Sequence, residues 1–472
     1  MTRRDFIRGG LAAGIGLKTQ PIIDFLNPQS TFPVVRRKVG ERHFTSPVIE
    51  ETITTVQGQI ANPELAWLFG NCFPNTLDTT VTYKEENGKP LTFVITGDID
   101  AMWLRDSSAQ VWPYLPLAKK DPKLQKLIAG VIRRQSRGVI LDPYANAFYD
   151  DPSRQSEWHT DFTLMKPGVH ERKWEVDSLC YTIRLAHGYW KATGDTSPFD
   201  DEWEKASDLI VQTFREQQRK EGKGPYHFLR DVPNPSLENP LAFGSPIKPN
   251  GLICSRFRPS DDPTQYQFLI PSNYFAATSL RELATMLDKI RHQPKKAAAA
   301  KALADEVDHA LKAHARYQHE TLGEIIPFEI DGLGNQLLMD DANVPSLLAM
   351  PYLGLLKKSD PLYKSTRKFV MSPENEQFYV GKYSGIGGHA GPDMVWPMYF
   401  IMRGLTSDSQ GEVTECLRIL TETHAGTGFM HEAFHKDDPK RFSRSWFAWA
   451  NTLFGEFVLD TLKRFPEVLK KP

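Results

Sequence analysis

Apolar residues recur every three or four positions from about Thr55 to the end of the chain, which is the spacing of amphipathic helices. Several of these stretches begin at Asp, Ser or Asn, the residue types that cap helix N-termini. The clearest predicted helices are residues 122–141, 174–192, 202–216, 273–289, 296–319, 344–356, 395–405, 411–424 and 446–463. Strand patterns are few and short, at residues 91–95 and 325–330. The pattern therefore predicts an all-α fold of about twelve helices.

Long polar loops separate the predicted helices at residues 142–172, 231–271 and 378–396. These loops hold clusters of charged and aromatic side chains, and a helical scaffold commonly presents its functional residues on such loops. Helices with functional loops at one end predict an (α/α)6 barrel, a toroid in which an inner ring of helices lies inside an outer ring. Periodicity alone does not distinguish this barrel from a helical solenoid, although the sequence has no fixed repeat period.

The chain has 472 residues, a length that allows about three domains. No Gly/Ser-rich or Pro-rich linker divides it, so we predict a single domain over residues 31–472. The formal net charge of −1 argues against a nucleic-acid partner, because phosphate binding needs a basic surface. No apolar run after the first twenty residues is long enough to span a membrane. The sequence does not predict an oligomeric state.

The N-terminus carries two adjacent arginines, Arg3 and Arg4, followed by the mildly apolar run of residues 9–17. This arrangement looks like a twin-arginine export signal. We therefore assign residues 1–30 to an export signal and leader and expect a periplasmic or secreted protein. A cytosolic amphipathic start is the alternative.

Four cysteines, Cys72, Cys180, Cys254 and Cys416, lie far apart in the sequence. None belongs to a Cys-x-x-Cys pair, which disfavours a structural zinc site. Apolar or aromatic neighbours suggest that they are buried free thiols, and two disulfides remain the alternative.

One short segment, residues 96–108, concentrates the groups that recognise sugars. Asp98, Asp100 and Asp106 offer carboxylates that accept hydrogen bonds from vicinal hydroxyls, and Arg105 is a forked donor. Trp103 offers an aromatic face for the apolar side of a pyranose ring. The alternative is an Arg105–Asp106 ion pair beside a buried Trp103, with a purely structural role.

A second acidic segment opens the predicted helix at residues 174–192. Glu175 and Asp177 fall in its first turn and are candidates for a site at the helix start. N-terminal capping by Asp177 is the alternative.

A third segment, residues 255–263, places Asp261 and Asp262 beside Arg256 and Arg258. Its prolines keep it from being the interior of a helix. Two adjacent carboxyl groups can hold a proton if they are buried, because like charges at close range raise one pKa. The alternative is a solvated turn in which Asp262 precedes Pro263.

A fourth segment contains His431-Glu432-x-x-His435, which on a continuous helix would be a zinc-metallopeptidase motif. Gly426 and Gly428 precede it and Pro439 follows, so any helix here would be very short.

Taken together and in order, these segments resemble glycoside hydrolase family 125, the exo-α-1,6-mannosidases. The resemblance extends from about Arg42 onward and rests on residues 96–108, 174–181, 256–262, 270–276, 383–397 and 428–432. It implies an (α/α)6 barrel and removal of terminal α-1,6-linked mannose with inversion. It also implies that no metal ion or other cofactor is required, and that the partner is an α-mannoside glycan or mannooligosaccharide.

Inverting hydrolysis needs one protonated carboxyl group as acid and one carboxylate as base. The resemblance assigns the acid to the Asp261–Asp262 pair, with Asp261 favoured, and the base to Glu432. The expected sugar ligands are Asp98, Asp100, Trp103, Arg105, Asp106, Glu175, Asp177 and His389. We further expect Arg256 and Arg258 to face sugar hydroxyls or Asp262.

Three classes of function thus remain: an exo-α-mannosidase, which we favour, a zinc metallopeptidase, and a non-catalytic glycan-binding protein. The two carboxylate loops disfavour the last class, and the short helix around His431 disfavours the second.

Overall fold

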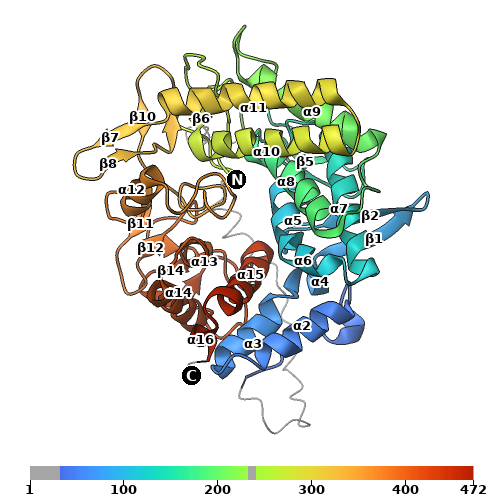
Figure 1. Cartoon of the computed structure of the whole chain (residues 1–472), viewed down its shortest axis with the longest axis vertical. Coiled ribbons are helices and arrows are strands. Elements are labelled where there is room, and N and C mark those ends of the chain that lie inside the picture. Colours follow the sequence, from blue (N-terminus) through green and yellow to red (C-terminus); the bar gives the residue numbers. More distant parts are fainter. Residues whose placement is uncertain (1–31, 232–240, 471–472) are drawn as a thin grey trace.

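The computed structural model describes residues 32–231 and 241–470, and the expected export signal lies outside these ranges. The described chain is mainly helical (Figure 1). The α-helices are α2 (Pro47–Gln57), α3 (Pro63–Cys72), α4 (Asn75–Thr79), α5 (Leu104–Val111), α6 (Leu115–Ala118), α7 (Pro122–Leu141), α8 (Val176–Thr193), α9 (Asp201–Gln217), α10 (Ile270–Lys289), α11 (Pro294–His314), α12 (Pro361–Val370), α13 (Pro397–Leu405), α14 (Gln410–Glu422), α15 (Ala448–Arg464) and α16 (Pro466–Leu469).

Short strands join the helices, so the expectation of an all-α fold was too simple. They are β1 (Val81–Glu86), β2 (Lys89–Val94), β3 (Met102–Trp103), β4 (Ala147–Phe148), β5 (Val169–Glu171), β6 (Phe268–Leu269), β7 (Tyr317–His319), β8 (Gly323–Ile325), β9 (Glu329–Ile330), β10 (Gln336–Leu337), β11 (Phe378–Tyr379), β12 (Gly385–Ile386), β13 (Met394–Val395), β14 (Phe434–His435) and β15 (Asp438–Phe442). They pair into small antiparallel sheets, among them β3–β4–β5 and β13–β14–β15. Strand β3 leads directly into α5, and β14 follows the loop that holds Glu432.

Most predicted helices are confirmed, and α7 has the predicted bounds. The predicted helix 296–319 is too long, because α11 ends at His314 and the chain then forms β7. The predicted helix 344–356 is wrong: the segment is a buried series of turns. Pro351 has no N–H for a helical hydrogen bond, and the Asp340 carboxylate accepts the N–H groups of Leu347 and Leu348.

Several helices begin with a polar capping residue that can be recognised in the sequence. Asp121 accepts N–H hydrogen bonds at the start of α7, and Asp200, Asp360 and Ser409 do the same for α9, α12 and α14. Such caps satisfy N–H groups that have no partner within the helix. These four helix starts are therefore fixed by local chemistry.

Four buried helices begin differently, and two of them, α5 and α8, carry site residues. Trp103, Glu175, Trp396 and Phe447 precede α5, α8, α13 and α15, and none of these side chains caps its helix. The four helices are strongly buried, and α5 packs against α8 and α15 while α13 packs against α15. Because no side chain caps these helices locally, polar groups near their starts are free to bind residues of other elements. Arg105 of α5, for example, binds Glu175 and Asp177 at the start of α8.

The two ends of the described chain lie together. Helix α3 packs against α15, and Figure 1 shows the blue N-terminal and red C-terminal helices side by side. His424, just after α14, also reaches α3, where its Nε2 lies 2.9 Å from Glu64 Oε1. All four cysteines are free and buried, as expected. In the described ranges we find no helix long and apolar enough to cross a membrane.

Candidate active site

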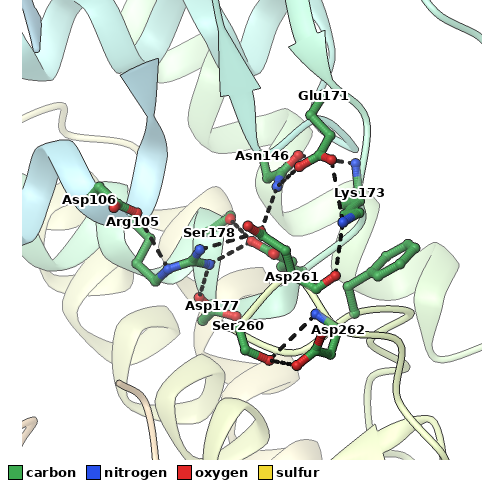
Figure 2. Close-up of polar contacts among 12 residues, drawn as sticks. Arg105, Asp106, Asn146, Glu171, Lys173, Asp177, Ser178, Ser260, Asp261 and Asp262 are labelled. Atoms are coloured by element: carbon green, nitrogen blue, oxygen red, sulfur yellow. Dashed lines mark hydrogen bonds and ion pairs between the residues drawn. The ribbon is translucent and has the colours of Figure 1, made fainter. Parts of the chain in front are cut away.

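The centre of the site is Arg105, in the first turn of α5 and only 3% exposed. Its Nη1 lies 2.6 Å from Glu175 Oε2 and 3.2 Å from Asp177 Oδ2, at the start of α8. Its Nε lies 3.6 Å from Asp106 Oδ2, and its Nη2 lies 3.6 Å from Asp261 Oδ1 (Figure 2). One guanidinium therefore gathers four carboxyl groups from three separate segments.

These carboxyl groups outnumber the positive charge and are shielded from water. Burial raises the pKa of Glu175 well above its usual range, and the nearby Asp261 adds to the effect. Burial also raises the pKa values of Asp106 and Asp177 to about 6, although Arg105 opposes the rise. The cluster therefore retains protons near neutral pH, because a single cation cannot balance four buried carboxylates.

Asp261 and its neighbour Asp262 have opposite surroundings (Figure 2). Asp261 adopts the left-handed backbone conformation with φ +63° and directs its carboxyl group toward Arg105, while Asp262 turns away and accepts a hydrogen bond of 2.9 Å from Ser260 Oγ. Lys173 Nζ donates to the Asp261 carbonyl oxygen at 2.9 Å, and Asn146 Nδ2 donates to Asp261 Oδ1 at 3.2 Å. The backbone strain at Asp261 is thus held by two buried donors.

A buried ion network supports these donors. Glu171 Oε1 accepts from Arg230 Nη2 at 2.6 Å and lies 3.3 Å from Lys173 Nζ, and Asn146 Nδ2 donates to Glu171 Oε2 at 3.3 Å. Although burial opposes it, the charges of Lys173 and Arg230 lower the pKa of Glu171 to about 2. Glu171 therefore stays ionised and orients both residues that contact Asp261.

The second carboxylate, Glu432, lies in a loop between α14 and α15 and is surrounded by donors. Ser443 Oγ and Arg444 Nη1 each lie 3.3 Å from its oxygens, and His389 Nε2 lies 3.7 Å away. Arg444 also forms an ion pair with Asp98. This environment favours the ionised form of a carboxyl group.

Asp106 links the two halves of the site. Its pKa responds to Asp261 and Arg105 on one side and to Arg444 on the other, so it lies near both groups. Arg444 in turn contacts Glu432. The loops of Asp261 and Glu432, which are separated by more than a third of the sequence, therefore converge on the N-terminal turn of α5.

A further acidic residue completes the cluster. Asp341 lies close enough to Arg258, Asp262 and His389 for their charges to act on it, and burial raises its pKa to about 6. Arg258 Nε also pairs with Glu329 Oε1 at 2.6 Å. Arg258 thus lies beside Asp262, as expected from the sequence.

Two expected ligands lie elsewhere. Asp100 pairs at 2.7 Å with Arg154, its side chain is 74% exposed, and it does not join the Arg105 cluster. Arg256 is fully buried and donates to the Leu241 carbonyl oxygen, so the expectation that it faces sugar hydroxyls was wrong. Trp103 is buried, meets His170 edge to face at 5.1 Å, and its Nε1 has no hydrogen-bond partner.

The zinc-peptidase hypothesis fails on local structure. The motif from His431 to His435 is a loop followed by β14, so the two imidazoles do not share the face of a helix. His431 is fully buried, stacks on Phe442 at 4.0 Å, and its Nδ1 lies 2.8 Å from the Arg444 carbonyl oxygen. Within residues 32–231 and 241–470, no group of three or more His, Cys, Asp or Glu is arranged to hold a metal ion.

Sequence reasoning missed several residues of the site. Asp341 follows another aspartate, as Asp262 does, and that repeated signal could have revealed it. Arg444 stands between two serines just before Trp446, which is a weaker signal. Asn146 and Lys173 reach Asp261 only through the fold, and no pattern in the sequence marks them.

A mainly helical fold that brings an acid-rich cluster and a donor-bound carboxylate to the start of one helix suits a glycoside hydrolase. The family described as metal-independent alpha-mannosidase (GH125) matches residues 62–459. The chain belongs to this family and is an α-mannosidase.

Similar proteins agree with this assignment. The chain is 42% identical to the Meiotically up-regulated gene 157 protein of Schizosaccharomyces pombe, over 93% of this chain and 90% of the yeast protein. It is 41% identical, with a TM-score of 0.85, to a metal-independent α-mannosidase of Streptococcus pneumoniae solved in a non-productive complex with α-1,6-mannobiose. That match covers 89% of this chain and 99% of the solved one. A bacterial glucoamylase shares the fold at 13% identity and a TM-score of 0.53, over 89% of this chain and 58% of the glucoamylase.

Proposed function

We propose that this chain is an exo-acting, inverting α-1,6-mannosidase in which Asp261 is the general acid and Glu432 the general base. One observation carries the proposal. Two loops bring Asp261, which lies in the buried carboxyl cluster, and Glu432, which is bound by donors, to the N-terminal end of α5. Inversion requires this pairing, because one group must give a proton to the leaving oxygen while the other takes one from water.

Asp261 is favoured over Asp262 as the acid by its contacts. It lies in the Arg105 cluster and shares a hydrogen bond with Glu175, a group that burial keeps largely protonated. Asp261 gives its proton to the glycosidic oxygen, and the neutral Glu175 donor and the charge of Arg105 then stabilise the carboxylate that forms. Asp262, held by Ser260 and near Arg258 and Asp341, is better suited to binding a sugar hydroxyl.

Glu432 is suited to the base role because hydrogen-bond donors and a cation surround its carboxyl group. Arg444 and Ser443 orient its oxygens, and His389 lies at the edge of the group. A water molecule held by such a carboxylate would attack the anomeric carbon on the face opposite the leaving group. Asp98 pairs with Arg444, and Asp106 lies near it. A sugar bound to these two carboxyl groups would therefore lie beside Arg444, which contacts the base Glu432.

The substrate is proposed from a relative and from the chemistry of the site. The Streptococcus pneumoniae relative bound α-1,6-mannobiose, and it matches this chain over 89% of its length. The carboxylates and arginines of this chain suit a hydroxyl-rich terminal sugar. Trp103, which meets His170 edge to face, and Phe257, whose ring lies 5.2 Å from Lys173 Nζ, supply apolar surface beside the cluster.

We also propose an (α/α)6 barrel as the full architecture and export of the protein by its twin-arginine sequence. The successive packing of α10, α8, α5, α15 and α13, and of α3 against α15, supports the barrel. The Arg3-Arg4 pair supports export. A periplasmic or secreted enzyme would meet extracellular α-mannosides.

Proton NMR of α-1,6-mannobiose during hydrolysis tests the reaction. The purified protein is treated exhaustively with EDTA, and spectra are recorded from the first minutes. We expect β-mannose before α-mannose, because inversion of the α-linkage gives the β-anomer. Early α-mannose would contradict inversion, while hydrolysis only of α-1,2- or α-1,3-mannobiose would contradict the proposed linkage.

A further inference from the structure

Glu171, on β5, is a buried anion that two intervening side chains join to Asp261. It is only 6% exposed, and although burial opposes it, the charges of Lys173 and Arg230 lower its pKa to about 2. Figure 2 shows Asn146 and Lys173 between Glu171 and Asp261. Glu171 is therefore a fixed negative charge near neutral pH, in the immediate surroundings of the acid.

The amide of Asn146 has one favourable orientation. Its Oδ1 accepts the backbone N–H of Lys173 at 3.1 Å. Its Nδ2 then faces Glu171 Oε2 at 3.3 Å and Asp261 Oδ1 at 3.2 Å, and an amide nitrogen has two hydrogens to donate. A flipped amide would turn its oxygen toward the Glu171 carboxylate, with no hydrogen between them. Glu171 thus fixes Asn146 as a donor to Asp261.

This donor distinguishes the two oxygens of Asp261. Oδ1 receives the Asn146 N–H and lies 3.6 Å from Arg105 Nη2. A carboxylic acid carries its proton on one oxygen, and the proton is disfavoured on the oxygen that faces N–H groups and a cation. The acidic proton is therefore directed to Oδ2. Lys173 Nζ holds the same residue at its carbonyl oxygen, at 2.9 Å.

Glu171 also acts on Asp261 by its charge. The charge of Asp261 raises the pKa of Glu171, and because the interaction of two charges is mutual, the Glu171 anion raises the pKa of Asp261. Repulsion between the two carboxylates thus favours the protonated form of Asp261, which is the form that a general acid needs. Lys173 has the opposite effect, since a nearby cation favours the carboxylate.

Other charged groups face the two carboxyl groups. Those that face Asp261 from neighbouring elements are Arg105 and Asp106 of α5, Glu175 and Asp177 of α8, and His170 of β5. Those that face Glu171, besides Asp261, are Lys173, Arg230, His170 and Asp161. The groups of α5 and α8 are the same in every variant below, so a difference between variants reports on the charges near Glu171.

We propose that Glu171 is a positioning residue for the general acid Asp261. Through Asn146 and Lys173 it directs the acidic proton to one oxygen, and its negative charge retains that proton to higher pH. This inference rests on the proposed mannosidase function and on Asp261 as its acid. It makes Glu171 a determinant of the pH above which activity is lost.

The pH dependence of kcat/KM on α-1,6-mannobiose tests the proposal in the full chain. The alkaline limb of this profile reports loss of the proton from the acid. Glu171→Gln keeps the size of the side chain and removes its charge, so we expect the limb to move down by about one pH unit. Lys173→Met removes the cation and should move the limb up. A purely structural role would not move the limb in opposite directions in the two variants.

Asp161→Asn is the matched control. Asp161 is 5% exposed and its Oδ2 lies 3.3 Å from Nε of the same Arg230, yet among the described residues it forms no hydrogen bond or ion pair with Asn146 or Lys173. Its substitution should leave the alkaline limb where it is in the wild type.

The leaving group gives a second readout. Glu171→Gln should lose more kcat/KM on mannobiose than on an aryl α-mannoside with an acidic phenol, which leaves without a proton. An unchanged limb in Glu171→Gln, or a limb that moves the same way in Glu171→Gln and Lys173→Met, would overturn the inference and leave the mannosidase function intact. If Glu171→Gln does not fold, the upward move in Lys173→Met still tests the charge effect.

If the wild type hydrolyses neither substrate, the proposed function fails, and infrared difference spectra still decide the role of Glu171. The carbonyl stretch of protonated Asp261 is identified by its loss in Asp261→Asn. We expect this band to disappear at a pH about one unit lower in Glu171→Gln than in the wild type. Disappearance at the same pH in both chains would overturn the inference.

Discussion

The two halves of the site contain the same functional group in opposite environments. On the Asp261 side, four buried carboxyl groups share one guanidinium, so protons are retained. On the Glu432 side, only two carboxyl groups, those of Glu432 and Asp98, share Arg444, and Ser443 and His389 lie beside Glu432. The chain thus separates an acid from a base by the ratio of carboxyl groups to cations, not by residue type.

The largest expected effect comes from removing the base. Glu432→Gln keeps the shape and the contacts to Arg444 and Ser443 but cannot take a proton from water. We expect kcat on α-1,6-mannobiose to fall by about 10³-fold or more, within the range of general-base contributions, with the sugar's Kd nearly unchanged. Initial rates and calorimetric titration measure the two quantities. Substantial turnover by this variant would assign the base elsewhere.

Removing the acid should give a loss that depends on the leaving group. Asp261→Asn should lower kcat/KM on mannobiose by about 10²-fold or more, because its sugar leaving group needs a proton. An aryl α-mannoside with an acidic phenol should lose much less.

Asp262→Asn is the matched control for this variant. Because Asp262 faces Ser260, we expect a similar, modest loss on both substrates. If the two variants exchange these behaviours, Asp262 is the acid.

A smaller effect should test the hydrogen bond between Glu175 and Asp261. Burial raises the pKa of Glu175 well above its usual range, so we expect a neutral side chain at pH 6. Glu175→Gln then preserves a neutral hydrogen-bond donor, and kcat/KM at pH 6 should stay within about threefold of the wild type. Glu175→Ala, which removes the partner of Arg105 and Asp261, should lose more. A large loss in the Gln variant would mean that Glu175 acts as an anion.

The smallest effect on catalysis is expected from a buried carboxyl group outside the site. Glu456, on α15, accepts a hydrogen bond from Tyr352 at 2.8 Å, and burial raises its pKa to about 7, while Arg184 opposes and Asp460 supports the rise. The folded protein favours the protonated form, so stability is highest below pH 4.5 for this group and falls as pH rises through about 7.

Glu456→Gln should abolish that fall and leave kcat/KM unchanged. We expect the variant to gain about 1–3 kcal/mol relative to the wild type between pH 5 and pH 8. Urea unfolding at the two pH values measures the gain. If the difference in free energy of unfolding between the wild type and Glu456→Gln does not change over this range, Glu456 is already ionised in the folded protein.

Sequence predictions succeeded where the deciding interactions lie within a few residues, and failed where they join distant segments. Helix starts capped by Asp121, Asp200 and Ser409 were predictable because the cap and the N–H groups lie within three residues. The segment with Pro351 was mistaken for a helix because its apolar spacing is helical, whereas its N–H groups bind Asp340. For the site, the sequence indicated the acidic segments but could not show that Arg256 is buried or that Asp100 pairs with Arg154.

By itself, the sequence determined most of the helical segments, where many of them begin, and which short segments carry carboxyl, guanidinium and aromatic groups. Periodicity and local capping are enough for this, because they act over a few residues. The tertiary structure alone decided that Asp261 faces Arg105 while Asp262 faces Ser260, that Glu432 meets Arg444, and that the cluster retains protons. Protonation depends on burial and on charges brought from distant segments, and only the folded chain sets both.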